Sequence, residues 1–170
     1  MKENFDYIIV GAGSAGCVLA NKLSENQKSS VLLLEAGGKD NNLFIHMPSG
    51  YSQIVPKASK QNYGFETEPE TNTAERKLYW PRGRGWGGSS SINAMIYTRG
   101  HSSDYDHWRQ LGNPGWSYDD VLPYFKRAEN YEGDGDRKFH GKNGPLNVKK
   151  SDRDDDILLD KFIEAGAQAG

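Results

Sequence analysis

The residues nearest the N-terminus combine an apolar run with a glycine pattern suited to a phosphate-bearing ligand. The apolar run at positions 7–10 continues directly into Gly11-Ala12-Gly13-Ser14-Ala15-Gly16. In this order Gly11 permits a tight turn off a strand, Gly13 leaves room for a pyrophosphate, and Gly16 lets the following helix pack closely. A helix that begins here points its free amides and positive dipole end at an anion.

A carboxylate follows where a dinucleotide-binding unit needs one. Glu35 ends a second apolar run, residues 31–34. An acid at the end of the second strand can accept hydrogen bonds from both hydroxyls of an adenosine ribose, and it disfavours the 2′-phosphate of NADP. The order strand, glycine turn, helix, strand, acid predicts a dinucleotide-binding βαβ unit, with NAD and FAD both open.

A second glycine-rich segment, residues 83–91, holds four glycines and three serines in nine residues. An apolar stretch that we expect to be helical follows it. Glycines allow close backbone approach to a ligand, and serine hydroxyls and helix N-terminal amides can donate to phosphate oxygens. The segment is no P-loop, because Ser89 rather than Lys follows Gly88.

The elements that position these residues are of α/β class. Ala15, Val18, Leu19 and Leu23 fall on one apolar helix face. Asn26 suits a left-handed helix stop, and the two apolar runs suit parallel strands covered on both faces. We therefore predict a Rossmann-like βαβ unit, incomplete within this chain, with irregular and helical extensions.

The domain organisation is predicted in three stretches. Residues 1–40 form the βαβ unit, residues 41–110 an extended segment with the Gly/Ser loop and helix, and residues 111–170 a helical region that includes a helix at 155–170. A doubly wound sheet needs more parallel strands than these two. We expect the chain to be the N-terminal part of a longer protein, with one nucleotide-binding domain completed by later sequence.

Composition excludes several other functions. The chain has 170 residues, a net charge of −2 and a mean hydropathy of −0.80, so it offers no basic field for nucleic acid. No apolar run is long enough for a transmembrane helix, and the N-terminus lacks an apolar signal region, which favours a cytoplasmic protein. The single cysteine, Cys17, excludes a disulfide framework.

The long run Gly83-Arg84-Gly85-Trp86-Gly87-Gly88-Ser89-Ser90-Ser91-Ile92-Asn93, continued by Tyr97, Gly100 and Asp106, resembles the first signature of the glucose–methanol–choline (GMC) oxidoreductases. These are FAD-dependent alcohol dehydrogenases and oxidases. The N-terminal glycine pattern and the stretch Glu35-Ala36-Gly37-Gly38 fit as well. Residues 116–125 and 140–146 are similar to segments of choline dehydrogenase-like members, so the resemblance covers nearly the whole chain.

This resemblance implies a role for each matching residue. The FAD pyrophosphate would lie on Gly11, Gly13, Ser14, Ala15 and Gly16, and the adenosine ribose on Glu35. The segment beside the flavin would comprise Gly85, Gly87, Gly88, Ser89, Asn93, Ala94, Met95 and Ile96. Some family members attach FAD covalently through a histidine just before the asparagine, a position that holds Ile92 here. We therefore predict non-covalent FAD.

No residue of the chain is predicted to be catalytic or to bind a metal. Family members carry their catalytic histidine near the C-terminus, in sequence that this chain does not contain. His46, His101, His107 and His140 are scattered in polar settings. The spacing of His101, Asp104, Asp106 and His107 fits no common metal site.

Three functional hypotheses remain open. The first is an FAD-dependent oxidoreductase that acts on the CH–OH group of a small alcohol or choline, with an unknown electron acceptor. The second is an NAD-binding domain of another dehydrogenase. The third is a nucleotide-binding fragment that catalyses no reaction and is prone to aggregate.

Overall fold

The computed structural model describes residues 4–150 and 157–170. It divides into two compact units, Met1–Ile96 and Tyr97–Gly170. The division into stretches 1–40, 41–110 and 111–170 stays a prediction.

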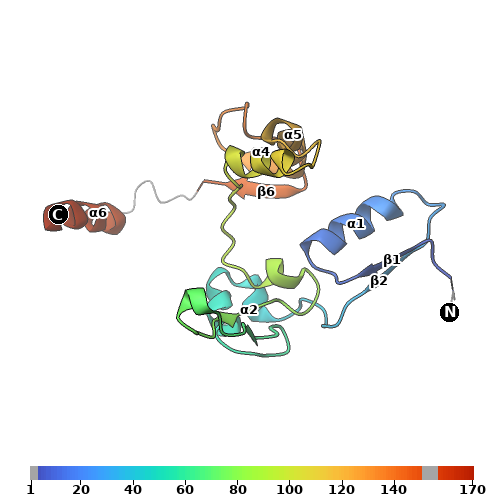
Figure 1. The fold of residues 1–170 in the computed structure, drawn as a ribbon, viewed down its shortest axis with the longest axis horizontal. Coiled ribbons are helices and arrows are strands. Elements are labelled where there is room, and N and C mark those ends of the chain that lie inside the picture. The colour runs from blue at the N-terminus through green and yellow to red at the C-terminus, as the bar shows by residue number, and fades with distance from the viewer. Residues whose placement is uncertain (1–3, 151–156) are drawn as a thin grey trace. The chain divides into compact units, whose positions relative to one another are not determined.

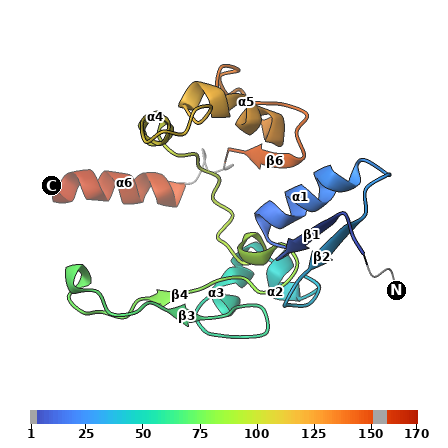
Figure 2. The ribbon, with the colours of Figure 1, turned by 45° about the vertical axis from the view of Figure 1, so that its right-hand side comes forward.

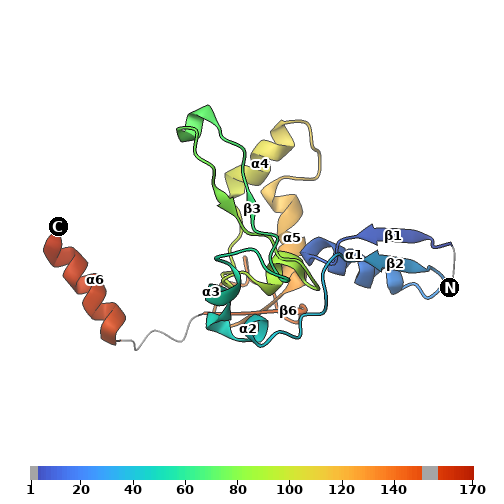
Figure 3. The same cartoon turned by 90° about the horizontal axis from the view of Figure 1, so that it is seen from below.

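The N-terminal part of the first unit is a βαβ motif, as predicted. Strand β1 (Tyr7–Val10), helix α1 (Ser14–Ser24) and strand β2 (Val31–Leu34) follow in order. The strands are parallel, in register from Tyr7 opposite Val31 to Val10 opposite Leu34. Helix α1 lies along one face of this pair (Figures 1 and 3). A Cβ built on Gly16 would lie 1.9 Å from the Gly11 carbonyl oxygen and 3.4 Å from the Ile9 side chain, which confirms the predicted close packing.

Two expectations about this motif were wrong. Asn26 does not adopt the left-handed conformation. The helix ends at Ser24 with a right-handed cap at Glu25, and the Asn26 Oδ1 instead accepts from the Lys28 amide at 3.1 Å. The two strands are not covered on both faces either, because Ile8 is 61% and Val10 83% exposed while Ile9 is buried.

The remainder of the first unit consists of short elements. These are α2 (Leu43–His46), the 3₁₀ turn η1 (Pro48–Gly50), α3 (Tyr51–Ile54), β3 (Phe65–Glu66), the 3₁₀ turn η2 (Thr71–Thr73), β4 (Tyr79–Trp80) and the 3₁₀ turn η3 (Gly88–Ser91). Strands β3 and β4 form an antiparallel ribbon with Phe65 opposite Trp80 (Figure 2). The ribbon leads from the small helices into the second glycine-rich segment.

The second unit contains two helices, a parallel strand pair and a further helix. These are α4 (Ser102–Gln110), α5 (Tyr118–Ala128), β5 (Glu129–Glu132), β6 (Leu146–Lys149) and α6 (Ile157–Ala169). Helix α6 falls within the helix predicted at 155–170, whose first two residues lie outside the described part of the chain. Aromatic rings join α4 to α5, with the Tyr105 and Phe125 ring centroids 5.6 Å apart. No helix among the described residues has the length and apolar character to cross a membrane.

Candidate dinucleotide site

The turn between β1 and α1 forms one wall of the candidate site. Gly11 has a φ of +95°. The first intrahelical bond runs from the Cys17 amide to the Gly13 carbonyl oxygen at 2.9 Å, so the amides of Ser14, Ala15 and Gly16 precede it and have no intrahelical acceptor. A Cβ built on Gly13 would meet no described atom within 4 Å. The turn therefore offers open space beside a helix N-terminus.

The second glycine-rich segment forms the opposite wall. Gly85, Gly87 and Gly88 all have positive φ values, of 138°, 85° and 56°. The Gly87 amide donates to the Ala12 carbonyl oxygen at 2.8 Å. A Cβ built on Gly88 would lie 2.9 Å from the Gly13 Cα. The two glycine segments, far apart in sequence, thus contact each other directly.

The Glu35 carboxylate joins three backbone segments. Its Oε2 accepts from the Ala12 amide at 2.7 Å, and its Oε1 accepts from the Gly37 amide at 2.8 Å and the Gly85 amide at 3.0 Å. The Gly37 hydrogen bond lowers the pKa of Glu35 most, and the Ala12 and Gly85 amides add to it against an opposing effect of burial. Glu35 is therefore held ionised while it ties both glycine walls to the end of β2.

The crossing of residues 37–38 with residues 84–86 is tightly packed. A Cβ built on Gly37 would lie 2.4 Å from the Gly85 amide nitrogen. The Trp86 amide donates to the Gly38 carbonyl oxygen at 3.1 Å. This close approach requires glycine at position 37. It holds residues 84–86 against the segment that follows β2.

The prediction of a helix after the second glycine segment is wrong. Only the short turn η3 forms, and residues 92–96 are not helical. Met95 has a φ of +57°, and the Asn93 Oδ1 accepts from the Met95 amide at 2.9 Å. This local hydrogen bond closes a turn that competes with a helix. Asn93, Ala94, Met95 and Ile96 consequently form an exposed segment.

The three serines of this segment differ in what their hydroxyls can still do. Ser90 donates to the Gly87 carbonyl oxygen and Ser91 to the Trp86 carbonyl oxygen, both at 2.6 Å. Ser89 instead accepts from the Gly83 amide at 3.1 Å. Among the described residues the Ser89 proton is thus not committed to an acceptor, which makes Ser89 the serine best able to donate to a ligand.

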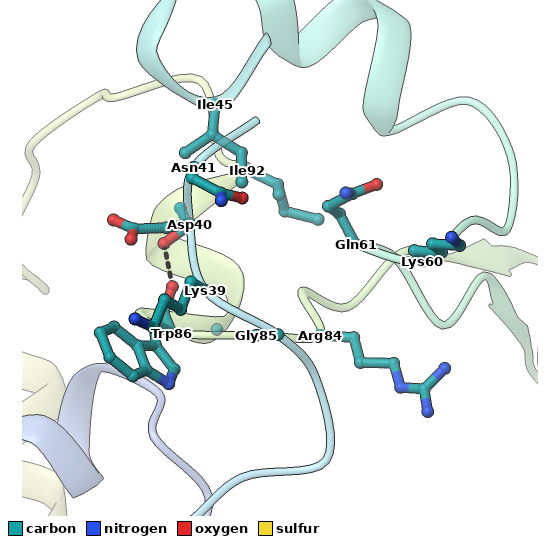
Figure 4. A pocket seen from close by; sticks show the side chains of 13 residues that line it. Lys39, Asp40, Asn41, Ile45, Lys60, Gln61, Arg84, Gly85, Trp86 and Ile92 are labelled. Carbon is teal, nitrogen blue, oxygen red and sulfur yellow. Dashed lines mark hydrogen bonds between the residues drawn. The ribbon is translucent and has the colours of Figure 1, made fainter. Parts of the chain in front are cut away.

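Three hollows adjoin these walls in the described part of the chain; the smallest, of about 170 Å³, is lined in part by His46, Ser90, Ser91, Asn93 and Met95, and the other two are larger. One of about 390 Å³ lies at the carboxyl ends of β1 and β2, lined by Val10, Gly11, Leu34, Glu35, Ala36 and Tyr63. The other, of about 340 Å³, lies against residues 84–86 and is lined in part by Lys39, Asp40, Gln61 and Ile92 (Figure 4). The hollow of about 390 Å³ contains Glu35 and is therefore the one that fits the predicted adenosine position.

The histidines do not gather at this site in the described chain. The His46 Nε2 lies 2.6 Å from the Asp40 carbonyl oxygen. His101 caps α4, where its Nδ1 accepts from the Ser103 amide. The His140 Nδ1 lies 3.0 Å from Glu129 Oε1. Each of these three serves local structure.

Sequence reasoning missed two buried polar residues. Asn62 and Glu129 are both fully buried. Glu129 accepts from the Arg99 guanidinium at 2.9 Å and the Gly141 amide at 2.7 Å. Neither residue belongs to a motif, and each looks like an ordinary surface residue in the sequence, so no local signal identified it.

The chain is similar to known oxidoreductases along nearly its whole length. The family model described as GMC oxidoreductase matches residues 5–170. An oxygen-dependent choline dehydrogenase from Vibrio vulnificus is 49% identical over 171 residues, which cover 100% of this chain and 30% of that protein. The homologous enzyme of Sinorhizobium fredii is 48% identical over 165 residues, 97% of this chain and 30% of its own length.

Solved structures of oxidases also match nearly the whole chain. Pyridoxine 4-oxidase from Mesorbium loti matches with a TM-score of 0.84 and 40% identity, over 98% of this chain and 32% of that one. A variant of Aspergillus oryzae formate oxidase, studied for FAD modification, matches with a TM-score of 0.78 and 29% identity, over 94% of this chain and 29% of its own. The chain thus spans about 30% of the length of the curated relatives it matches. With the family model covering almost every residue, the chain belongs to the GMC oxidoreductase family.

Proposed function

We propose that this chain binds FAD between its two glycine segments. The pyrophosphate would lie against Gly11, Gly13, Ser14, Ala15 and Gly16, with Ser89 donating from the opposite wall. The backbone of Gly85, Gly87 and Gly88 would approach the cofactor closely, and the flavin would lie along Asn93, Ala94, Met95 and Ile96. The observation that carries this proposal is the direct contact of the two segments, through the Gly87 amide and the Ala12 carbonyl oxygen.

The residues present fit a dinucleotide. The space beside Gly13 is open and faces amides without intrahelical acceptors. The Glu35 carboxylate offers about four acceptor positions, of which three are taken by amides. Because the Ala36 amide also acts on the carboxylate, Glu35 retains room for at most one ribose hydroxyl, fewer than the two expected of it from the sequence.

The activity that we propose for the whole protein is oxidation of the CH–OH group of a small alcohol. Bound FAD would supply a two-electron acceptor that takes up hydride at its N5. In this chain, Asn93 to Ile96 would orient the flavin with their exposed backbone amides and the Asn93 side chain. The relatives named choline dehydrogenase support choline or a similar alcohol as the substrate. The words "oxygen-dependent" in their names suggest O₂ as an acceptor to test first.

We further propose that FAD is held without a covalent bond. Ile92 is 5% exposed and carries no nucleophile, so the position before Asn93 cannot attach the flavin. Acid precipitation of the yellow protein should release all flavin absorbance to the supernatant. Flavin that stays with the pellet would contradict this proposal.

The test of function begins with the purified full chain. We expect the chain to show a flavin spectrum with maxima typical of oxidised FAD that excess ADP displaces, and the whole protein, with its catalytic histidine, to bleach under anaerobic conditions on addition of choline. An NAD-binding domain would show no flavin absorbance and would bind NAD⁺ instead. A chain that binds ADP but neither FAD nor NAD⁺ would support the inactive-fragment hypothesis.

A further inference from the structure

Asn62 is a buried amide with an unusually complete set of hydrogen bonds. Its Nδ2 lies within 3.2 Å of the carbonyl oxygens of Ile54, Val55 and Lys57 and 2.9 Å from the Tyr79 hydroxyl. Its side chain has no solvent exposure. The two N–H groups of this nitrogen are shared among these acceptors, which include the Ile54 and Val55 carbonyls that the end of α3 leaves without helical partners.

The oxygen of the same side chain faces the second glycine segment. Asn62 Oδ1 accepts from the Arg82 amide at 3.1 Å and from the Gly64 amide at 3.0 Å. The backbone continues this pairing, since the Tyr63 amide donates to the Arg82 carbonyl oxygen and the Arg84 amide to the Gln61 carbonyl oxygen. Residues 61–63 thus hold residues 82–84 in a short ladder that ends where the second wall of the dinucleotide site begins.

We infer that Asn62 is a positioning residue for the flavin side of the site, because it fixes residues 82–84 against the end of α3 and thereby sets the position of Gly85–Gly88. This inference rests on the proposed binding of FAD. In the described part of the chain Asn62 makes no side-chain hydrogen bond to a residue assigned to the cofactor, and it acts through the backbone of Arg82. The adenosine side, built by Gly11–Gly16 and Glu35, has its own supports in β1 and β2.

The geometry predicts an asymmetric effect on two ligands. ADP would use the first wall, Glu35 and, from the second wall, only the Ser89 hydroxyl, whereas FAD would also need Gly85–Gly88 and the segment after them in place. Loss of Asn62 should therefore weaken FAD more than ADP. A residue with only a general structural role would weaken both ligands together.

The experiment compares Asn62→Leu, Asn62→Asp and a control, Thr67→Val, in the full chain. The Thr67 hydroxyl accepts from the Leu78 amide at 3.0 Å in the same β3–β4 ribbon but does not reach residues 82–88. We expect Asn62→Leu to weaken FAD at least tenfold and ADP less than twofold, and Thr67→Val to change neither by more than twofold. Asn62→Asp keeps the acceptor for Arg82 but places a carboxylate oxygen against three carbonyl oxygens. Because the ionised carboxylate is repelled by these oxygens, the loss of FAD affinity relative to the unchanged chain should be larger at pH 8 than at pH 5.

A readout without cofactor separates this inference from the proposed function. Hydrogen exchange of the ligand-free chain should accelerate in peptides covering residues 80–92 of the Asn62 variants and stay unchanged in peptides covering residues 11–24. If Asn62→Leu fails to fold, Asn62→Asp carries the same comparison. Equal losses of FAD and ADP, or exchange that rises equally in both regions, would overturn the inference. An unchanged chain that binds no FAD would overturn the proposed function instead, while the exchange result would still decide the role of Asn62.

Discussion

At the scale of single residues, the glycines around the candidate site are of two physical kinds. Gly16 and Gly37 are required by the protein itself, since a Cβ would lie 1.9 Å from the Gly11 carbonyl oxygen and 2.4 Å from the Gly85 amide nitrogen. A Cβ on Gly13 would meet no described atom within 4 Å. A glycine that the folded chain does not need, next to a helix N-terminus, indicates room kept for a ligand.

Gly13→Ala should therefore lower FAD affinity much more than it lowers stability, because Gly13 is the N-cap of α1 and alanine is less favourable than glycine there. The added methyl group would occupy the space proposed for the pyrophosphate, and we expect FAD to bind at least tenfold more weakly. The thermal midpoint of the ligand-free chain should fall by no more than about 4 °C in Gly13→Ala and stay nearly unchanged in Gly38→Ala. Gly38 is the matched control, because its Cβ also meets no described atom and its φ is not positive. Equal FAD affinity in the two variants would contradict the proposed path of the cofactor.

Glu35→Gln should destabilise the chain in a pH-dependent way. A glutamine amide would turn one N–H group toward the backbone N–H groups that now donate to the carboxylate, and a charge-assisted hydrogen bond contributes roughly 1.5–3 kcal/mol. The folded-state pKa of Glu35 lies below its ordinary value of 4.5. The stabilisation is therefore complete above about pH 4.5 and is lost as the pH falls through the folded-state pKa.

Urea unfolding of the unchanged chain and of Glu35→Gln at pH 7 and pH 3.5 measures this effect. The difference in the free energy of unfolding should be about 2 kcal/mol at pH 7 and should shrink at pH 3.5. Other acids titrate in both proteins, so their contributions cancel in the difference. A difference that stays constant with pH would show that the Glu35 charge does not stabilise the fold.

At the scale of elements, the β1–α1–β2 motif could be predicted because its signals are local. Two apolar runs, a glycine turn and an acid each specify their own position. The contact of Gly87 with Ala12 and the hydrogen bonds of Glu35 with Gly85 join residues far apart in the chain, and no periodicity encodes them. The segment after Ser91 was predicted to be helical from its apolar character, whereas the Asn93 side chain closes a turn onto the Met95 amide. The hydrogen bond of the Asn93 side chain to the backbone competes with the hydrogen bonds of a helix, which explains why no helix forms there.

Helix α5 illustrates a predictable terminus. Ser117 precedes the helix, its hydroxyl accepts from the Asp120 amide, and the Asp120 carboxylate accepts from the Ser117 amide at 3.0 Å. The Ser117 hydroxyl also donates to the Asp120 carboxylate, and this hydrogen bond lowers the pKa of Asp120. Ser117 and Asp120 thus form a capping box, which the sequence pattern Ser-x-x-Asp predicts.

Ser117→Ala should destabilise α5 by about 1 kcal/mol, because a helix N-terminus loses its side-chain acceptor. Ser117→Thr retains the hydroxyl and should restore most of the loss. Chemical denaturation followed by the circular dichroism of the helices gives the comparison. If alanine and threonine at this position gave the same stability, the capping box would not stabilise this chain.

At the scale of the whole molecule, the two units carry different kinds of polar centre. The first unit holds Glu35 at the intersection of the glycine segments, where amides of both segments donate to its carboxylate. In the second unit the buried Glu129 carboxylate forms hydrogen bonds with the Arg99 guanidinium, the His140 ring and the Gly141 amide. Burial raises the pKa of Glu129, but these donors, led by the Gly141 amide, outweigh it and lower the pKa overall. The second centre holds β5, residues 140–141 and the segment around Arg99 together.

Glu129→Gln should therefore destabilise the second unit selectively. It removes the countercharge of Arg99, whose side chain is only 12% exposed, and breaking a buried pair from one side costs about 3–5 kcal/mol. Glu132→Gln, an exposed acid at the other end of β5, should change stability by no more than about 0.5 kcal/mol. Hydrogen exchange of Glu129→Gln should accelerate in peptides from residues 97–150 and stay unchanged in peptides from residues 4–96. Uniform acceleration along the chain would mean that the two units unfold as one, and that Glu129 stabilises the dinucleotide site as well as its own unit.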